Sequence, residues 1–280
     1  MPQAIPLWKT KARSVEKAGK QFRQKSPDAI HDLRVALRRV SATAQALGRD
    51  KLAKQSKKLV RSLSDLRQFE VDRRLLARVR ELGWLPEEVA AGIDARWDSL
   101  LRDGEKDATR KIRAERLDRL ARKLSRLSKK KQGDLLDRLE KAHRRAERDL
   151  TTPPDESNDR TLHRYRLAVK QARYLTEDLA LAGRGGLERE IEGKKRIQDA
   201  LGRWNDLRLF RRHLVATRDE AEHRGTVTFA LELDRLIAAL DPAVLSVRSQ
   251  ALGVVRGTSG VATARRRRSS ATAPAPASRM

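Results

Sequence analysis

Residues 30–40 read Ile-His-Asp-Leu-Arg-Val-Ala-Leu-Arg-Arg-Val, and residues 162–172 read Leu-His-Arg-Tyr-Arg-Leu-Ala-Val-Lys-Gln-Ala, 132 positions later. Both copies have a His, an Arg three positions on, an Ala after five and a cation after seven. Residues at i, i+3 and i+7 lie on one face of an α-helix. The repeat therefore predicts two helices, each carrying a short row of His and cations.

The same two segments carry an apolar stripe beside the cations. In the first copy the stripe is Ile30, Leu33, Leu37, Val40, Ala44 and Leu47, and in the second it is Leu162, Tyr165, Val169, Ala172 and Leu179. The stripe and the cation row are centred roughly 110° apart on a helix. We therefore expect one face of each helix to pack while the neighbouring face presents positive charge from a rigid support.

The chain is strongly basic, with a formal net charge of +26 over 280 residues. The last 24 residues hold five Arg and no acidic residue, so residues 1–256 still carry +21. Such an excess resists compaction and favours a polyanionic partner. A surface that only confers solubility has its positive and negative charges closer to balance.

Several classes of protein are disfavoured by the composition. Cysteine is absent, which excludes disulfides and thiolate chemistry and fits a reducing compartment. No apolar run approaches the ~20 residues of a membrane span, and the N-terminus lacks the apolar region of a secretory signal. The cytoplasm is the expected location. Aromatic residues make up only 4%, which argues against a base-stacking platform for single strands.

The apolar periodicity is helical throughout and persists nowhere as strand alternation, which predicts an all-α fold. We expect helices over residues 7–25, 28–48, 50–82, 86–110, 134–150, 158–182, 187–222 and 226–240, with a very basic stretch of helical period to residue 131. The segment 187–222 is compatible with one helix or two. From Gly257 onward, small residues, Arg265 to Arg268 and Ala-Pro repeats predict a disordered basic tail.

A second internal match supports a duplication. Residues 57–68 lie 138 positions before residues 195–206, and both segments begin with two cations. The sequence therefore predicts two four-helix bundles related by a pseudo-twofold axis. We place the first half at residues 1–110, the second half at 111–242, and a disordered basic tail rich in Ala, Pro and Arg at 243–280.

The repeated motifs resemble those of CHAD-domain proteins, the conserved histidine α-helical domain. The resemblance rests on His31-x-x-Arg34-Val35-Ala36-x-Arg38-Arg39, on His163-x-x-Arg166-x-Ala168-x-Lys170-x-x-Arg173-Tyr174, and on the segment from Ile197 to Asp206. It covers about residues 10–240. It implies an all-helical fold of two four-helix bundles whose basic surface binds inorganic polyphosphate.

The chain departs from the family pattern in its first half. Ser41 stands where the second copy has Arg173, so one cation of the row is missing. The family's Arg-Asp-x-Asp is Arg-Gln-Phe-Glu here, at residues 67–70.

Phosphate chains offer charge and oxygen acceptors but no base edge, so Arg forks and Lys point charges suit them. The candidate polyphosphate-binding residues are His31, Arg34, Arg38, Arg39, Lys57, Lys58, Arg61, His163, Arg166, Lys170, Arg173, Lys195 and Arg196. Of these, the cations on residues 57–61 and 195–196 are equally compatible with a solvated helix face. The two histidines are interpreted as phosphate donors when protonated, and the alternative is that each orients a neighbouring side chain.

Two other functions compete with polyphosphate binding. The same cations suit the backbone of a nucleic-acid duplex, with the Arg265–Arg268 tail as a nonspecific arm, although no helix-turn-helix or zinc signature appears. An enzyme acting on phosphate esters is disfavoured, because His143, His213 and His223 lack metal-ligand spacing and no Gly-rich phosphate loop is present. We therefore expect a binding protein with no catalytic residue, no metal and no cofactor. The sequence leaves open whether it sits on polyphosphate granules.

Overall fold

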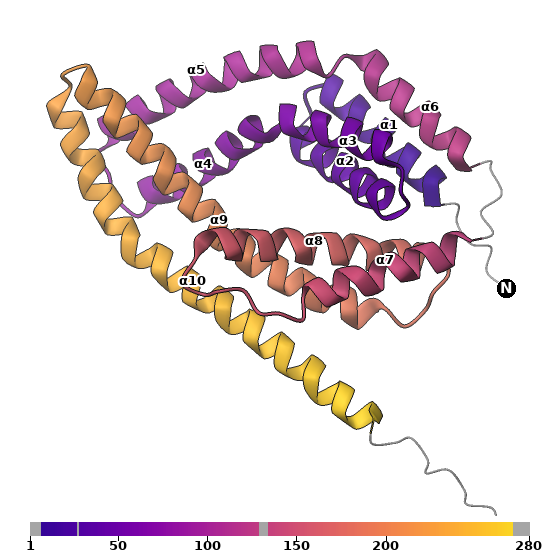
Figure 1. Cartoon of the computed structure of the whole chain (residues 1–280). Helices are drawn as coiled ribbons and strands as arrows, with labels where there is room; N and C mark the ends of the chain where they lie inside the picture. Colours follow the sequence, from indigo (N-terminus) through magenta and orange to yellow (C-terminus); the bar gives the residue numbers. More distant parts are fainter. Residues whose placement is uncertain (1–6, 27, 129–133, 271–280) are drawn as a thin grey trace, which may run out of the picture.

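The computed structural model describes residues 7–26, 28–128 and 134–270, with side chains described as far as residue 257. These residues form ten α-helices and no strand, which confirms the all-helical prediction. The helices are α1 (Leu7–Arg23), α2 (Ala29–Ala46), α3 (Asp50–Ser62), α4 (Ser64–Glu81), α5 (Glu87–Lys111), α6 (Ala114–Ser128), α7 (Leu135–Asp149), α8 (Asp159–Leu181), α9 (Glu188–His223) and α10 (Val227–Ser270) (Figure 1).

The helix expected over residues 50–82 is wrong in one respect, because it is broken at Leu63 into α3 and α4. The Leu63 side chain is fully buried, and its backbone N–H bonds the carbonyl of Val60 rather than the carbonyl four residues back. Nη1 of Arg34 donates to the carbonyl oxygens of Leu63 (2.8 Å) and Ser64 (2.9 Å). A side chain from α2 thus binds the backbone at the break.

The last helix does not end at residue 240 as expected, since α10 continues through Pro242 to Ser270. Proline removes one backbone hydrogen bond and crowds the preceding turn. The helix is held by apolar contacts on both sides of it, from Leu236 and Leu240 before the proline and from Leu252 and Val255 after it. Residues 243–257 of the predicted tail are therefore helical and packed. Residues 271–280 lie outside the described part of the chain.

The buried apolar side chains form three clusters. The first core packs α1, α2, α3 and α6 against one another and against the C-terminal part of α8. The second core joins α4 and α5 to the far ends of α9 and α10, around Trp97 and Phe210. The third core packs the first turns of α8 against α9 and α10, around Trp204. The first two cores draw on both predicted halves, and the division into two four-helix bundles stays a prediction.

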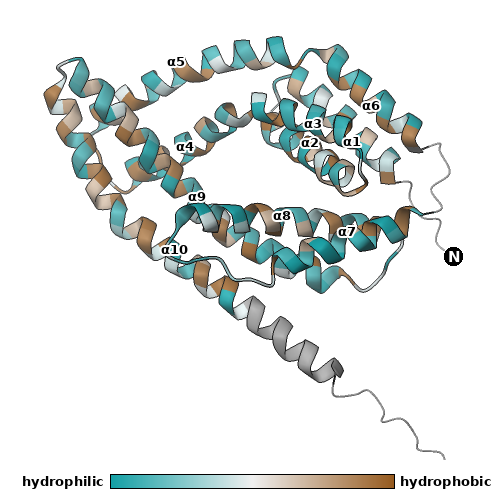
Figure 2. Ribbon diagram, viewed as in Figure 1, coloured by the Kyte–Doolittle hydropathy of each residue, from teal (hydrophilic) through white to brown (hydrophobic). Residues whose placement is uncertain are grey.

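The polarity of the helices matches this arrangement. Figure 2 shows hydrophilic and hydrophobic residues alternating along the helices, as in helices with one packed face and one solvated face. Among the described residues, no helix combines the length and apolar character needed to cross a membrane.

Helices α2 and α8 are fixed to one another by polar as well as apolar contacts. Asp178 of α8 is buried, and Oδ1 accepts a hydrogen bond from Lys11 Nζ at 2.7 Å while Oδ2 accepts one from Thr43 Oγ1. Ala172 and Leu175 of α8 belong to the first core beside the apolar face of α2. The relative position of the two helices is thus defined at several points.

Replacing Asp178 with Ala should destabilise the protein by about 3–5 kcal/mol, because the buried ammonium of Lys11 loses its counter-charge. Urea denaturation followed by circular dichroism measures the free energy of unfolding. Arg78→Ala, which removes the exposed pair between Arg78 and Glu81, is the control and should change it by less than about 1 kcal/mol. A decrease of similar size in both variants would contradict this account of the α1–α2–α8 junction.

Candidate anion-binding site

Four cations from two helices meet where α2 packs against α8. Arg34 and Arg38 lie one turn apart on α2, and Arg166 and Lys170 lie one turn apart on α8. Lys170 is within electrostatic reach of the other three. All four side chains are half-buried. These four residues are called the cation cluster below.

No carboxylate is bonded to the cation cluster in the described part of the chain, although the charges of Glu70 and Asp65 oppose the lowering of the Arg34 pKa. Within the described residues, no hydrogen bond or ion pair joins Arg38, Arg166 or Lys170 to a partner, and Nε of Arg166 is buried and unbonded. The carboxylate of Asp206, on α9, is not bonded to Arg166 or Lys170, but its charge favours their protonated forms. Buried polar groups in proteins are normally bonded, so the unbonded Nε of Arg166, beside two half-buried cations without described partners, makes this cluster a candidate site for an anion.

The other buried charges of the described chain contrast with the cluster. The ammonium of Lys11 is bonded to Asp178, and the ammonium of Lys194 lies 2.5 Å from Glu190. The carboxylate of Asp72 is bonded to His213 at 2.5 Å and to Gln68 at 2.9 Å. Each of these buried charged groups thus has a bonded partner within the fold.

Burial and the repulsion of neighbouring cations lower the pKa values of Arg34, Arg166 and Lys170. Burial, followed by the charges of Arg166 and Arg38, lowers the pKa of Lys170 to about 6. Burial, followed by Arg38 and Arg67, lowers the pKa of Arg34 to about 10, so that this guanidinium stays charged at neutral pH. Burial also lowers the pKa of Arg166, against the opposing charge of Asp206. An incoming anion would relieve these shifts.

The two predicted histidines flank the cluster in different settings. His31 is exposed at the surface, and partial desolvation of its ring, followed by the charge of Arg67, lowers its pKa. His163 is half-buried, and its Nδ1 lies 3.3 Å from the amide oxygen of Asn205. Burial lowers the pKa of His163, and the hydrogen bond with Asn205 opposes the shift. The contact with Asn205 agrees with the interpretation in which His163 orients a neighbouring side chain, and its role as a phosphate donor stays a prediction.

Arg39 and Arg173 are held beside the cluster by one carboxylate. Arg39 lies 3.0 Å from Glu177, and Arg173 Nη1 donates to Glu177 at 2.6 Å. Both guanidiniums also lie over the ring of Tyr174, with centroid distances of 5.9 and 4.9 Å. These two predicted residues are therefore partly neutralised, unlike the four cations of the cluster.

The remaining predicted cations are exposed on α3 and α9. They are Lys57, Lys58, Arg61, Lys195 and Arg196. Lys57 contacts Gln45 at 3.5 Å and Lys195 lies 3.9 Å from Glu192, and no described contact joins any of the five to the cluster. Their part in binding stays a prediction. The side chains of Arg265 to Arg268 lie outside the described residues.

Residues on other helices also act on the site, and they are not among the predicted ones. The charge of Arg67, on α4, contributes to the lowered pKa values of His31 and Arg34. The charge of Arg208, on α9, contributes to the lowered pKa of His163, and its guanidinium lies 5.3 Å from the centre of the Trp204 ring. Asp206 is an acidic residue whose charge opposes the lowering of the Lys170 pKa. Arg67 and Asp206 both lie in the second internal match, so the sequence repeat could have identified them as candidate site residues.

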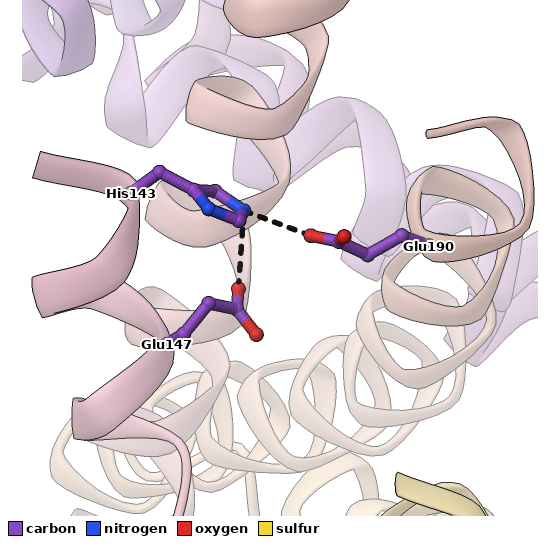
Figure 3. A group of neighbouring side chains, drawn as sticks. All are labelled: His143, Glu147 and Glu190. Atoms are coloured by element: carbon purple, nitrogen blue, oxygen red, sulfur yellow. Dashed lines mark hydrogen bonds and ion pairs between the residues drawn. The ribbon is translucent and has the colours of Figure 1, made fainter. Parts of the chain in front are cut away.

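A second group of titratable residues lies where α7, α8 and α9 meet, away from the cluster. Nε2 of His143 lies 2.8 Å from Glu190 and 3.6 Å from Glu147 (Figure 3). The three residues have a spacing that suits a metal ion. However, the buried ammonium of Lys194 contacts both carboxylates, at 2.5 and 3.0 Å. A lysine thus already provides the positive charge there.

Hydrogen bonds at this junction also set the charge of Glu190. Burial alone would raise its pKa, but bonds from His143 and Lys194 outweigh burial and lower the pKa to about 2. We therefore interpret the junction as structural.

Comparison with known proteins places these observations in a family. The sequence model of the CHAD domain matches residues 11–215. PptA from Streptomyces chartreusis has a similar structure, with a TM-score of 0.70 and 16% identity over 92% of this chain and 100% of that chain. The CHAD domain from the plant Ricinus communis gives a TM-score of 0.69 and 17% identity over 92% and 91%. No curated protein sequence matches the chain.

Replacing Lys170 with Met should stabilise the free protein near pH 6, by up to about 6 kcal/mol if the whole pKa shift is expressed as stability. The folded chain holds the pKa of Lys170 at about 6, against 10.5 for an ordinary lysine, so between these values the unfolded chain binds a proton that the folded chain releases. The wild type therefore loses stability relative to the variant as the pH falls from about 10 to about 6. Guanidinium denaturation across this range measures the difference.

Lys195→Met, at an exposed position, is the matched control and should show no such trend. A difference between Lys170→Met and wild type that stays constant with pH would contradict the electrostatic description of the cluster.

Proposed function

The chain belongs to the CHAD domain family, and on that premise we propose that it binds inorganic polyphosphate, without hydrolysing it, at the cation cluster between α2 and α8. The observation that supports this most is the absence of described partners for Arg38, Arg166 and Lys170, in a fold that pairs its other buried charges. A phosphate chain supplies the counter-charge that the four cations lack.

The chemistry of the cluster suits a chain of phosphates. Each phosphate unit carries negative charge and several oxygen acceptors, and guanidinium groups bind such oxygens through paired N–H donors. A charge-assisted hydrogen bond contributes roughly 1.5–3 kcal/mol. Arg34 commits only Nη1 to the backbone of Leu63 and Ser64, so its other nitrogens remain for a ligand. Because the donors stand on packed helices, binding orders few side chains.

We infer that the internal duplication builds one shared site rather than two separate ones. Arg34 and Arg166 occupy equivalent positions of the repeat, as do Arg38 and Lys170, and the packing of α2 on α8 brings both pairs together. This arrangement is what a pseudo-twofold relation between the halves would produce. The histidines at the start of each row extend the positive surface once a polyanion favours their charged forms.

Replacing Arg38 or Arg166 with Ala should weaken binding of long-chain polyphosphate by about 10- to 100-fold each. The slope of log affinity against log salt should flatten by about 0.7 for each phosphate that the variant no longer neutralises. Biolayer interferometry with immobilised polyphosphate at several salt concentrations measures both quantities. Neither residue bonds a described partner, so weaker binding is not explained by a broken structural interaction.

Arg122→Ala removes the same charge from the exposed face of α6 and should leave affinity within about twofold. Equal decreases in affinity in all three variants would show that binding depends on the net charge of the protein and not on this site. Duplex DNA at the same phosphate concentration should displace little polyphosphate, and full displacement would favour nucleic acid as the partner instead.

Polyphosphate binding near pH 7.5 should take up about one proton per protein, because the ligand returns the ammonium charge to Lys170, whose pKa is about 6 in the free protein. Affinity should therefore fall by up to about tenfold per pH unit above pH 6. Calorimetric titration in two buffers of different ionisation enthalpy gives the proton count. Lys170→Met should lose most of the uptake, and an unchanged count in this variant would assign the proton to another group.

A further inference from the structure

The outward side of α1 carries positive charges that have no ionic partner. These exposed cations recur at helical spacing and are Lys9, Arg13, Lys17 and Lys20. The opposite side of α1 faces the core, where Lys11 is buried and bonded to Asp178 of α8 at 2.7 Å. The exposed cations of α1 therefore point away from α8 and from the cation cluster.

Helix α6 continues this positively charged surface. Its exposed cations are Arg116, Arg119, Arg122, Lys123 and Arg126. α6 packs on α1 at the edge of the molecule (Figure 1), and a Cβ atom at Gly19 would lie 3.2 Å from Cδ1 of Leu117. Arg23 of α1 lies 3.6 Å from Asp118 of α6 where the two exposed sides meet. The exposed cations of α1 and α6 are called the outer basic face below.

Carboxylates do not neutralise the outer basic face. Within the described part of the chain, none of its cations is in an ion pair, and Arg119 bonds only the backbone carbonyl oxygen of Glu115, at 3.2 Å. Glu16 is exposed nearby but bonds none of these cations. On α4, in contrast, the exposed Arg73 lies 2.9 Å from Asp98 of α5. The outer basic face thus keeps its charge, and such a surface attracts a polyanion.

The residue types on the outer basic face favour one kind of polyanion. Among the described side chains of α1 and α6, no large apolar side chain is exposed, so neither helix has anchors that enter a membrane or stack on unpaired bases. Successive cations stand about one helical turn apart, roughly 5.4 Å, which suits a regular phosphate backbone. The major groove of B-DNA is wide enough for an α-helix at the edge of a protein, whereas that of A-form RNA is narrow.

We propose that the outer basic face binds double-stranded DNA through its phosphates, without sequence preference. The cations of α6 contact phosphates on the two sides of the major groove, and those of α1 contact the neighbouring backbone. Neither Asn nor Gln, the side chains that read adenine, occurs on α6. This binding goes beyond the proposed function and does not depend on it, because the outer basic face points away from the cation cluster.

The test titrates a fluorescently labelled DNA duplex of about 20 base pairs with the full chain and follows its anisotropy at several salt concentrations. The combined variant Arg119→Gln, Arg122→Gln and Arg126→Gln should bind at least about tenfold more weakly at about 0.1 M salt. Its slope of log affinity against log salt should flatten by up to about 2.7, since each lost phosphate contact removes about 0.9. Melting temperatures check that the variants are folded.

The matched control combines Lys141→Gln, Arg189→Gln and Arg212→Gln, which removes the same net charge from exposed positions on α7 and α9. Its affinity for DNA should stay within about threefold of wild type. Equal weakening in the two combined variants would overturn the proposal, because binding would then follow net charge alone.

Three further probes separate this face from other assignments. The α6 variant should keep its affinity for long-chain polyphosphate within about threefold, and a loss as large as the loss for DNA would overturn the proposal of a separate face. A duplex RNA of the same length should bind more weakly than DNA, and vesicles of anionic phospholipid should not displace the DNA. Tighter binding of the RNA, or displacement by the vesicles, would assign the face to that partner and overturn the proposal.

Discussion

The packing of α2 against α8 holds mutually repelling groups together, since Arg38 opposes the charges of Arg34 and Arg166, and all three arginines lower the pKa of Lys170. In a flexible chain these groups would separate, because like charges in a partly dry environment oppose one another strongly. They stay together because α2 and α8 are locked by apolar packing in the first core and by the buried Asp178. The free energy of packing thus offsets the repulsion within this positively charged surface.

The surroundings of the cluster limit how that surface can rearrange. Arg34 is bonded to the backbone where α3 gives way to α4, and Glu177 holds Arg39 and Arg173 at the edge. These interactions fix Arg34 and the edge of the cluster, whereas no described side-chain bond holds Arg38, Arg166 or Lys170. On the proposed function, the packed helices fix where these donors begin, and a flexible phosphate chain adapts its own shape to them.

Local signals in the sequence predict much of this structure, whereas interactions between distant helices leave no such signal. The helical period and the repeat identify α2, α8 and the equivalence of Arg34 with Arg166. The break at Leu63 is not predicted because its sequence favours helix, and its partner is a side chain 29 positions away. The continuation of α10 through Pro242 depends on packing in two cores. The sharing of Glu177 by Arg39 and Arg173 likewise has no signature within either helix.

The path of α10 has a consequence for how the protein matures. The third core supports the first turns of α8, including the turn that carries His163, and it is completed by Ala251, Leu252 and Val255 near the end of the chain. These residues follow both repeats along the chain, so they emerge from a ribosome after both repeats. Until residues 251–255 have emerged, the apolar face on the first turns of α8 lacks the part of its cover that α10 supplies.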